Sequence, residues 1–290
     1  MVLASLLFAM MSVCIKSATA YFNTFELVCY RGVIGVVFMA VLCRQQGVAL
    51  ATTVPMMHGW RTLVGVVSLA AWFYAIAHLP LATATTLNYM SGIWVATFLI
   101  GGSLAMGKVQ DAGKQGPMVV TLLFGFAGVI MILRPTIEQN QLFAGVIGLL
   151  SGLLAAMAYL QVAGLGRAGE PESRTVFYFS VGTALTGALC MLFTGVNPWT
   201  WPEALWLLPI GVLAALGQLC MTRAYTSGAT LVVANLQYTG IVFSALFGLF
   251  LFGDDIPVIG WAGMGLIMVS GIAATVLRDR ALPDSPAEEH

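Results

Sequence analysis

Residues 142–164 read LFAGVIGLLSGLLAAMAYLQVAG, an uninterrupted run without a charged side chain. A bilayer-spanning helix requires about 20 consecutive, predominantly apolar residues, so this run is long enough to cross a membrane. The pattern predicts an all-α integral membrane protein with ten transmembrane helices. The other nine expected spans lie near residues 1–20, 24–43, 58–78, 82–105, 116–134, 173–194, 203–223, 229–252 and 257–277.

The composition agrees with a chain whose exterior faces lipid. Hydrophobic residues make up 59% of the 290 residues, charged residues make up 8%, and the formal net charge is zero. Such a chain has too little polar surface to coat a water-soluble globule of this size. Turn-forming residues separate the spans, as at Arg134-Pro135 and Gly253-Asp254-Asp255. Residues 278–290 are expected to form a polar cytoplasmic tail.

The distribution of basic residues predicts the orientation of the chain in the membrane. Lys and Arg are enriched in cytoplasmic loops. If both termini are cytoplasmic, nine basic residues fall on the inner side and only Arg134 on the outer side. The inner set is Arg44, Arg61, Lys108, Lys114, Arg167, Arg174, Arg223, Arg278 and Arg280.

An internal repeat divides the chain into two halves. The segment Leu87-Asn88-Tyr89 recurs as Leu236-Gln237-Tyr238, 149 positions later. Collinear matches nearby support residues 1–134 as a first five-helix repeat and residues 142–277 as a second. Because five is an odd number, the second repeat enters the membrane from the opposite side. Inverted repeats of this kind are typical of transporters that work by alternating access.

The span count, the repeat, Arg31, the segment 75–89 and the segment 236–254 together resemble the EamA-type drug/metabolite transporter superfamily. Within it, the chain is most similar to YddG-type aromatic amino-acid exporters. The resemblance implies export of aromatic and other neutral amino acids from the cytoplasm by alternating access. It also implies a multi-pass protein of the bacterial inner membrane. Export of other small metabolites or drugs on the same fold is the alternative.

Neutral polar and aromatic residues inside the spans are the candidates for substrate binding. Amides and hydroxyls can bind an ammonium and a carboxylate without fixed charges, and aromatic faces can stack on a ring. The alternative is that the aromatic residues form interfacial belts and the amides bond between helices. The candidates are Trp72, Tyr74, His78, Asn88, Tyr89, Trp94, Tyr159, Gln161, Asn235, Gln237, Tyr238 and Ser244.

Five further residues are expected to have structural or gating roles. Lys16 and Glu26 are expected to form an interfacial pair or to anchor their helices. Arg31 lies deeper, where backbone carbonyls or Glu26 are the expected partners and ligand contact is the alternative. Gly92 and Gly240 follow the repeated Leu-x-Tyr segments, where they could bend spans four and nine.

The scarcity of acids inside the spans predicts the type of transport. Proton-coupled exporters commonly use an intramembrane carboxylate, and none is found at mid-span here. We therefore expect facilitated export rather than tight proton coupling. Few charges are expected around the cavity, which favours neutral or zwitterionic solutes over sugar nucleotides or cations.

No residue pattern indicates catalysis, a metal or a cofactor. The five cysteines show no Cys-x-x-Cys spacing, and no His-Glu-x-x-His motif is present. An intramembrane enzyme is therefore only a remote alternative. The expected partners are an amino-acid substrate and the lipid bilayer, with no nucleic acid, and the chain is expected to be a monomer.

Overall fold

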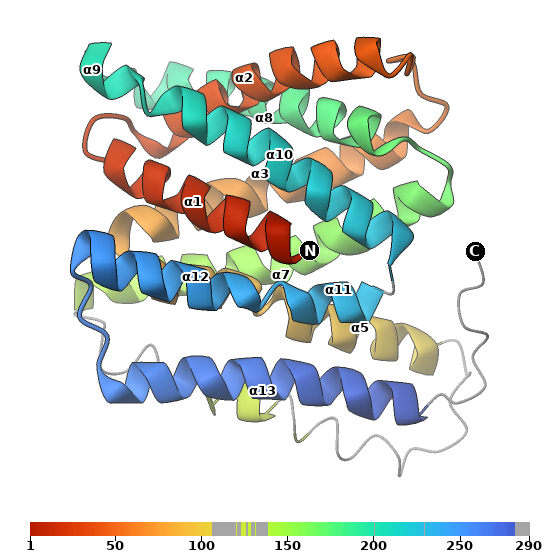
Figure 1. Cartoon of the computed structure of the whole chain (residues 1–290), viewed down its shortest axis with the longest axis vertical. Coiled ribbons are helices and arrows are strands. Elements are labelled where there is room, and N and C mark those ends of the chain that lie inside the picture. Colours follow the sequence, from red (N-terminus) through yellow and green to blue (C-terminus); the bar gives the residue numbers. More distant parts are fainter. Residues whose placement is uncertain are drawn as a thin grey trace.

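The computed structural model describes residues 1–105, 120, 123–125, 127, 128, 131, 139–199, 201–228 and 230–281. These residues form helices and connecting segments, and no strand occurs among them. Figure 1 shows the helices running side by side across the view, with the N-terminus and the end of α13 on the same side. The described chain is thus all-helical, as the sequence predicts.

Residues 1–105 contain five helices. The second begins with a capping box. The Asn23 side chain accepts the backbone N–H of Glu26, and the Glu26 side chain accepts the backbone N–H of Asn23. The third begins at a proline, a residue favoured in the first turn because it lacks an N–H. The helices are α1 (Val2–Ala18), α2 (Thr24–Gln45), α3 (Pro55–His78), α4 (Leu81–Tyr89) and α5 (Ser91–Ala105).

The described C-terminal part contains longer helices and several short ones. The four-residue α9 precedes α10, and a π-helical turn at Gly248–Phe252 follows α12. The helices are α7 (Gln139–Arg167), α8 (Glu172–Thr194), α9 (Trp201–Ala204), α10 (Leu207–Ser227), α11 (Thr230–Leu236), α12 (Thr239–Phe247) and α13 (Val258–Ala281).

Six described segments are long and apolar enough to cross a membrane, and two apolar helices, Val2–Ala18 and Val258–Ser270, are shorter. The chain is therefore a multi-pass membrane protein. The expected span 116–134 lies mostly outside the described residues, as does most of the expected tail 278–290. The six long segments are Thr24–Gln45, Pro55–His78, Gln141–Arg167, Glu172–Thr194, Trp201–Ser227 and Val232–Phe252.

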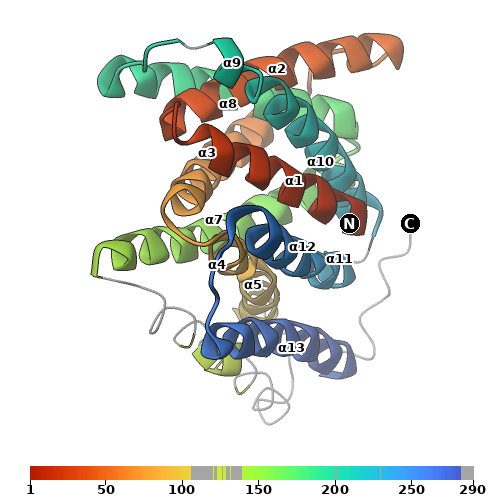
Figure 2. The ribbon, with the colours of Figure 1, turned by 60° about the vertical axis from the view of Figure 1, so that its left-hand side comes forward.

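Two of the expected spans are interrupted near their middle, and a third, 203–223, is interrupted near its start at Leu205 and Trp206. The run 82–105 is interrupted at Met90, between α4 and α5. The run 229–252 is interrupted at Gln237 and Tyr238, between α11 and α12. Sequence hydropathy did not reveal these breaks, because Met90 is as apolar as its neighbours and the single polar residue Gln237 does not interrupt the apolar run 229–252. Figure 2 shows α4 and α12 close together near the middle of the bundle.

Glycines bring α2 and α8 into backbone contact. A Cβ atom on Gly187 would lie 2.5 Å from the backbone nitrogen of Cys29, and one on Gly32 would collide with the backbone of Ala184. Without a hydrophobic driving force between helices in lipid, such close packing is a main source of helix association. The α2–α8 pair is one of the most extensive helix contacts in the described chain.

Replacement of Gly187 by alanine is expected to destabilise this contact. The new methyl group meets backbone atoms of α2, which cannot rotate away, and overpacking of this kind costs about 1–3 kcal/mol. The thermal unfolding midpoint in detergent measures the effect. Gly59→Ala is the matched control, because nothing lies within 4 Å of a Cβ at that helical position. Equal midpoints for the two variants would contradict the proposed role of Gly187.

Candidate functional site

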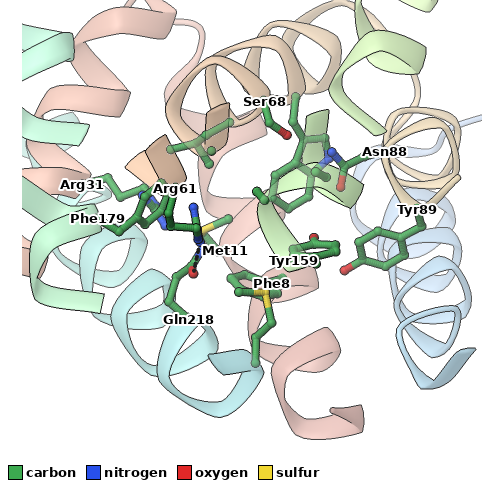
Figure 3. A pocket seen from close by; sticks show the side chains of 16 residues that line it. Phe8, Met11, Arg31, Arg61, Ser68, Asn88, Tyr89, Tyr159, Phe179 and Gln218 are labelled. Carbon is green, nitrogen blue, oxygen red and sulfur yellow. Dashed lines mark hydrogen bonds between the residues drawn. The ribbon is translucent and has the colours of Figure 1, made fainter. Parts of the chain in front are cut away.

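A small cavity lies at the centre of the helix bundle (Figure 3). Its volume of about 40 Å³ is room for about three water molecules, which is too small for a metabolite. The cavity is therefore narrow in this conformation. Its walls come from α1, α2, α3, α4, α7, α8 and α10, and its polar lining residues are Arg31, Arg61, Ser68, Trp72, Asn88, Tyr89, Tyr159 and Gln218.

Two buried arginines line one end of this cavity. The exposed fractions of Arg31 and Arg61 are 4% and 3%. Their guanidinium carbons lie 5.5 Å and 4.2 Å from the ring centroid of Phe179, within the range of cation–π attraction. Arg61 Nη2 donates a long hydrogen bond of 3.5 Å to Gln218 Oε1. Figure 3 shows these four side chains grouped together.

The hydrogen-bonding capacity of both guanidinium groups is largely unused. Arg31 Nε, Arg61 Nε and Arg61 Nη1 are buried and have no hydrogen-bond partner among the described residues. No ion pair to either arginine occurs in the described chain. A buried charge without a partner is costly, so this end of the cavity is suited to an anion.

The structure corrects two expectations about charge. Arg61 is counted with the inner basic residues in the orientation argument, but it lies in the second turn of α3, is buried and lines the cavity. The cavity was expected to contain few charges, yet two arginines line it. Arg31 is also bonded neither to Glu26 nor to a backbone carbonyl, since no hydrogen bond is formed by its guanidinium within the described chain.

Neutral polar residues line the opposite end of the cavity, where Figure 3 shows Ser68, Asn88, Tyr89 and Tyr159. Asn88 Nδ2 donates to Ser151 Oγ at 3.0 Å. Ser68 Oγ donates to the backbone carbonyl of Ser151 at 2.8 Å. These bonds orient the Asn88 amide and the Ser68 hydroxyl. Of the predicted substrate-binding residues, Trp72, Asn88, Tyr89 and Tyr159 thus lie together around one cavity.

Other predicted residues connect the two broken spans instead of lining the cavity. Gln237 Nε2 donates to Ser91 Oγ at 3.0 Å, across the two helix breaks. Ser244 Oγ accepts from Thr85 Oγ1 at 3.0 Å, which links α12 to α4. Gln237 and Ser244 are both fully buried. Their positions fit hydrogen bonding between helices, the alternative that the sequence left open.

The repeated tyrosines pack reciprocally against the repeated glycines. A Cβ on Gly92 would lie 2.5 Å from Tyr238 Oη, and a Cβ on Gly240 would lie 2.5 Å from Tyr89 Cε2. Each glycine therefore provides the space for the tyrosine of the other half. The helix breaks themselves fall two residues before Gly92 and two or three before Gly240. The glycines thus begin the second helical segments and do not form the breaks.

The remaining candidates lie elsewhere. Tyr74 and His78 stack on each other with ring centroids 4.2 Å apart, and His78 is exposed at the end of α3. Trp94 stacks on Phe98, with centroids 6.4 Å apart. Gln161 is partly exposed, although its Oε1 is buried without a partner in the described chain. The side chain of Asn235 lies outside the described residues.

One end of the bundle, predicted to face outwards, is closed by Asp254. This carboxylate accepts hydrogen bonds from Lys16 Nζ at 2.9 Å and 3.0 Å and from the backbone N–H of Leu81 at 2.9 Å. It thereby joins α1 and the start of α4 to the segment after α12. The expected Lys16–Glu26 pair is wrong, because Glu26 instead accepts the backbone N–H groups of Asn23 and Asn197.

The opposite end is closed by a buried polar cluster around Glu170. This carboxylate accepts hydrogen bonds from Thr52 at 2.9 Å, from His58 Nε2 at 3.0 Å and from Arg174 Nη1 at 3.2 Å. Burial alone would raise the pKa of the Glu170 carboxyl, but the hydrogen bonds from His58 and Thr52 and the charge of Arg174 outweigh it and lower the pKa. The cluster connects the α2–α3 loop to the α7–α8 loop.

Removal of the Glu170 charge is expected to destabilise this end in a pH-dependent manner. A carboxyl whose pKa is lowered by folding stabilises the protein above its unfolded value near 4.5, and that stabilisation is lost as the pH falls through the folded value. Glu170→Gln should therefore lower the free energy of unfolding by about 1–3 kcal/mol at pH 7. Thermal unfolding should show a smaller difference from wild type at pH 4. Glu172→Gln is the control, and a pH-independent difference would contradict the assignment.

Several lining residues were not predicted from the sequence. Gln218 and Ser68 are common, neutral side chains on otherwise apolar helices, and Phe179 resembles any core aromatic. The one available signal was Arg61, a charged residue inside an apolar run. Within the described ranges, no three metal-ligating side chains gather to form a candidate metal centre.

Comparisons with known proteins identify relatives over nearly the full chain, although no family model matches it. The pseudopaline exporter CntI of Pseudomonas aeruginosa is 36% identical over 274 residues, which are 94% of this chain and 93% of the exporter. An uncharacterized transporter of Helicobacter pylori is 29% identical over 93% of this chain and 91% of its own.

More distant matches extend to other transporters. A riboflavin transporter of Rhizobium johnstonii is 25% identical over 77% of this chain and 71% of its own length. One solved crystal structure aligns with a TM-score of 0.67 at 21% identity, covering 97% of this chain and 96% of the other. At that identity, the likeness supports the fold alone.

Proposed function

Because the chain belongs to the transporter family that includes the pseudopaline exporters, we propose that it exports a small polar metabolite across the bacterial inner membrane. Pseudopaline itself is the first candidate substrate to test. This proposal replaces simple amino-acid export as the leading interpretation, since the named relatives act on other metabolites. Assignment to the drug/metabolite transporter superfamily and to its EamA type is part of the same proposal.

The observation that carries the proposal is the narrow polar cavity in the middle of an apolar helix bundle. Polar groups inside a membrane are costly and mark substrate pathways. Arg31, Arg61 and Asn88 come from three different helices and line the same space. The closures at Asp254 and at Glu170 lie at opposite ends of this space, as expected for an occluded state of an alternating-access transporter.

Reciprocal contacts support two inverted repeats. Ile34 packs against Gly211, and Thr62 packs against Gly182. Ile34 and Gly182 are 148 positions apart, while Thr62 and Gly211 are 149 apart, so one contact maps onto the other. The helix pairs agree, since α1 packs on α10 as α7 packs on α3. We therefore retain ten spans, two inverted five-helix halves and cytoplasmic termini as proposals, with a monomer as the working unit.

Amino-acid export is the second candidate function. The neutral end of the cavity favours it, because Asn88, Tyr89 and Tyr159 could bind an ammonium or a hydroxyl group of an amino acid. The YddG-type specificity expected from the sequence stays a prediction within this candidate.

Efflux from preloaded proteoliposomes tests the proposed function. Liposomes containing pseudopaline, riboflavin, Phe or Thr are diluted into buffer with and without a pH gradient. We expect pseudopaline efflux to exceed that from loaded liposomes without protein. This efflux should not depend on the pH gradient, because no described acid lines the cavity. Efflux only of Phe and Thr would favour the second candidate, and no efflux of any solute would reject both.

Filling the cavity is expected to reduce this flux about tenfold. Ala158 lines the cavity and is 3% exposed, so Ala158→Leu would place three additional carbons into the small space. Leu150→Phe on the same helix is the control, since Leu150 is 43% exposed on the outer face of α7. Size-exclusion profiles verify that both variants are folded. Equal flux through both variants would show that the substrate does not pass through this cavity.

A further inference from the structure

We propose that Arg31 and Arg61 bind carboxylate groups of the exported molecule, so that its substrates are organic anions and not neutral or zwitterionic solutes. The inference rests on the proposed export function and names the chemical class of substrate for the same cavity. It assigns a role to two side chains whose charges have no ion-pair partner in the described structure.

The first argument is the number of free donors. A guanidinium has five N–H groups in a planar fork that matches the geometry of a carboxylate. Arg31 makes no hydrogen bond in the described chain, and Arg61 makes one at the distance limit of 3.5 Å. Both side chains are more than nine-tenths buried and both line the cavity. Their donors therefore remain available to a ligand.

The second argument is electrostatic. Both guanidinium groups lie against the same ring, that of Phe179, so two positive charges share one end of the cavity. Glu26 and Glu170 do not neutralise these charges, because their carboxylates are hydrogen-bonded to Asn197 and His58, respectively, at the ends of the bundle. The Phe179 ring offsets only a small part of the desolvation cost. A ligand with one or two carboxylates would supply the missing negative charge.

The third argument concerns the other end of the ligand. Asn88 Nδ2 donates one of its two N–H groups to Ser151, and this bond orients the amide so that its Oδ1 can accept from a ligand N–H or O–H group. The Asn88 amide and the arginines lie at opposite ends of the cavity (Figure 3). This arrangement fits a molecule with a carboxylate at one end and an amine or hydroxyl at the other. A substrate of this kind has a net negative charge when it carries a second carboxylate.

Export of an anion has a consequence for energetics. Over a complete cycle, an uncoupled carrier moves only the charge of its substrate. A membrane potential of 100 mV, negative inside, then multiplies the equilibrium outside-to-inside concentration ratio about 50-fold for each net negative charge. The potential would therefore drive export without the intramembrane acid that proton coupling commonly requires.

Binding of a matched series of probes tests the inference. Succinate, succinamate and succinamide share one carbon skeleton and carry two, one and no negative charges. Their dissociation constants for the purified protein in detergent are measured by isothermal titration calorimetry. We expect affinity to fall about tenfold with each carboxylate replaced, as for a lost charge-assisted hydrogen bond. Equal affinities, including no binding of any probe, would overturn the inference.

Variants assign the effect to the two arginines. In Arg31→Gln and in Arg61→Gln, the preference for succinate over succinamate should shrink about tenfold. Arg44→Gln is the control, because Arg44 is exposed in the last turn of α2. Thermal unfolding establishes that each variant is folded. Unchanged preference in both folded variants would contradict the assignment. If phosphate binds as tightly as succinate, the assignment to carboxylates is wrong and the site binds anions in general.

Flux measurements separate this inference from the proposed function. Proteoliposomes preloaded with labelled succinate and pseudopaline are given a potassium diffusion potential, negative inside. Faster efflux under this potential than without it would support anion export. Pseudopaline efflux that does not respond to the potential and persists in both glutamine variants would leave the export function standing and reject the anion site. Absence of any efflux, together with the expected binding series, would reject the export function and leave the anion site standing.

Discussion

Replacement of Asp254 by asparagine is expected to open the predicted outer end of the bundle and to increase access to the cavity from outside by about 30- to 150-fold. In the closed state, one carboxylate holds both Lys16 Nζ and the backbone N–H of Leu81. The side chains of Lys16 and Asp254 are 19% and 12% exposed, so the ion pair is only partly screened by solvent. Loss of its charge should cost about 2–3 kcal/mol of closure.

This effect is measured by labelling from outside. Met11 lines the cavity and is fully buried, so Met11→Cys provides a reporter in a background without the native cysteines. A membrane-impermeant maleimide should label the reporter faster in Asp254→Asn than in its parent. Asp255→Asn is the matched control, because Asp255 is the exposed neighbour on the same segment. Equal labelling rates in the two variants would show that Asp254 does not hold this end closed.

Replacement of Gly92 by alanine is expected to reduce transport by about 10- to 100-fold. The new Cβ would lie 2.5 Å from Tyr238 Oη and 3.0 Å from Tyr238 Cζ. Tyr238 is 2% exposed and its surroundings are packed, so the ring has little room to move. The collision falls where the two broken spans meet, and overpacking there costs about 1–3 kcal/mol in this closed conformation. Initial efflux rates from proteoliposomes measure the effect.

A second substitution distinguishes this collision from general damage. Tyr238 Oη is buried without a hydrogen-bond partner in the described chain, so Tyr238→Phe alone should be almost neutral. In the double variant Gly92→Ala/Tyr238→Phe the nearest atom is gone, and we expect partial recovery of transport. Gly240→Ala should recover less with Tyr89→Phe, because the nearest atom there is the ring carbon Cε2.

The control for this series is Gly101→Ala in α5. Nothing lies within 4 Å of a Cβ at that position. Transport by this variant should equal that of the wild type. If Gly92→Ala transports normally, or if Tyr238→Phe fails to improve it, then the tyrosine–glycine contact does not control the conformation of the broken spans.

Much of the fold could be predicted from the sequence because lipid imposes strict local rules. Every spanning helix needs an apolar run of sufficient length. Spans such as 24–43 and 173–194 could therefore be predicted from their own residues alone. Part of the cavity was also predictable. Asn88, Tyr89 and Tyr159 are polar or aromatic side chains in apolar runs, and such residues tend to face the protein interior.

The helix breaks could not be predicted in the same way. Met90 and Tyr238 are compatible with a continuous apolar helix, and the breaks depend on contacts between segments that are far apart in the sequence. Gln237 bonds to Ser91 across both breaks, a contact that exists only when the two halves are assembled. The pairing of Lys16 likewise depended on where the chain brings Asp254, 238 positions away.

The sequence by itself determined that this protein lies in a membrane and is helical, because both properties follow from local hydropathy. Only the tertiary structure decided the chemistry of its centre. Arg31 and Arg61 are 30 positions apart, and the sequence alone suggests a structural residue and a member of the inner basic set, respectively. Folding places both against Phe179 with unused N–H donors, because helix packing, and not local sequence, determines which charges share a cavity.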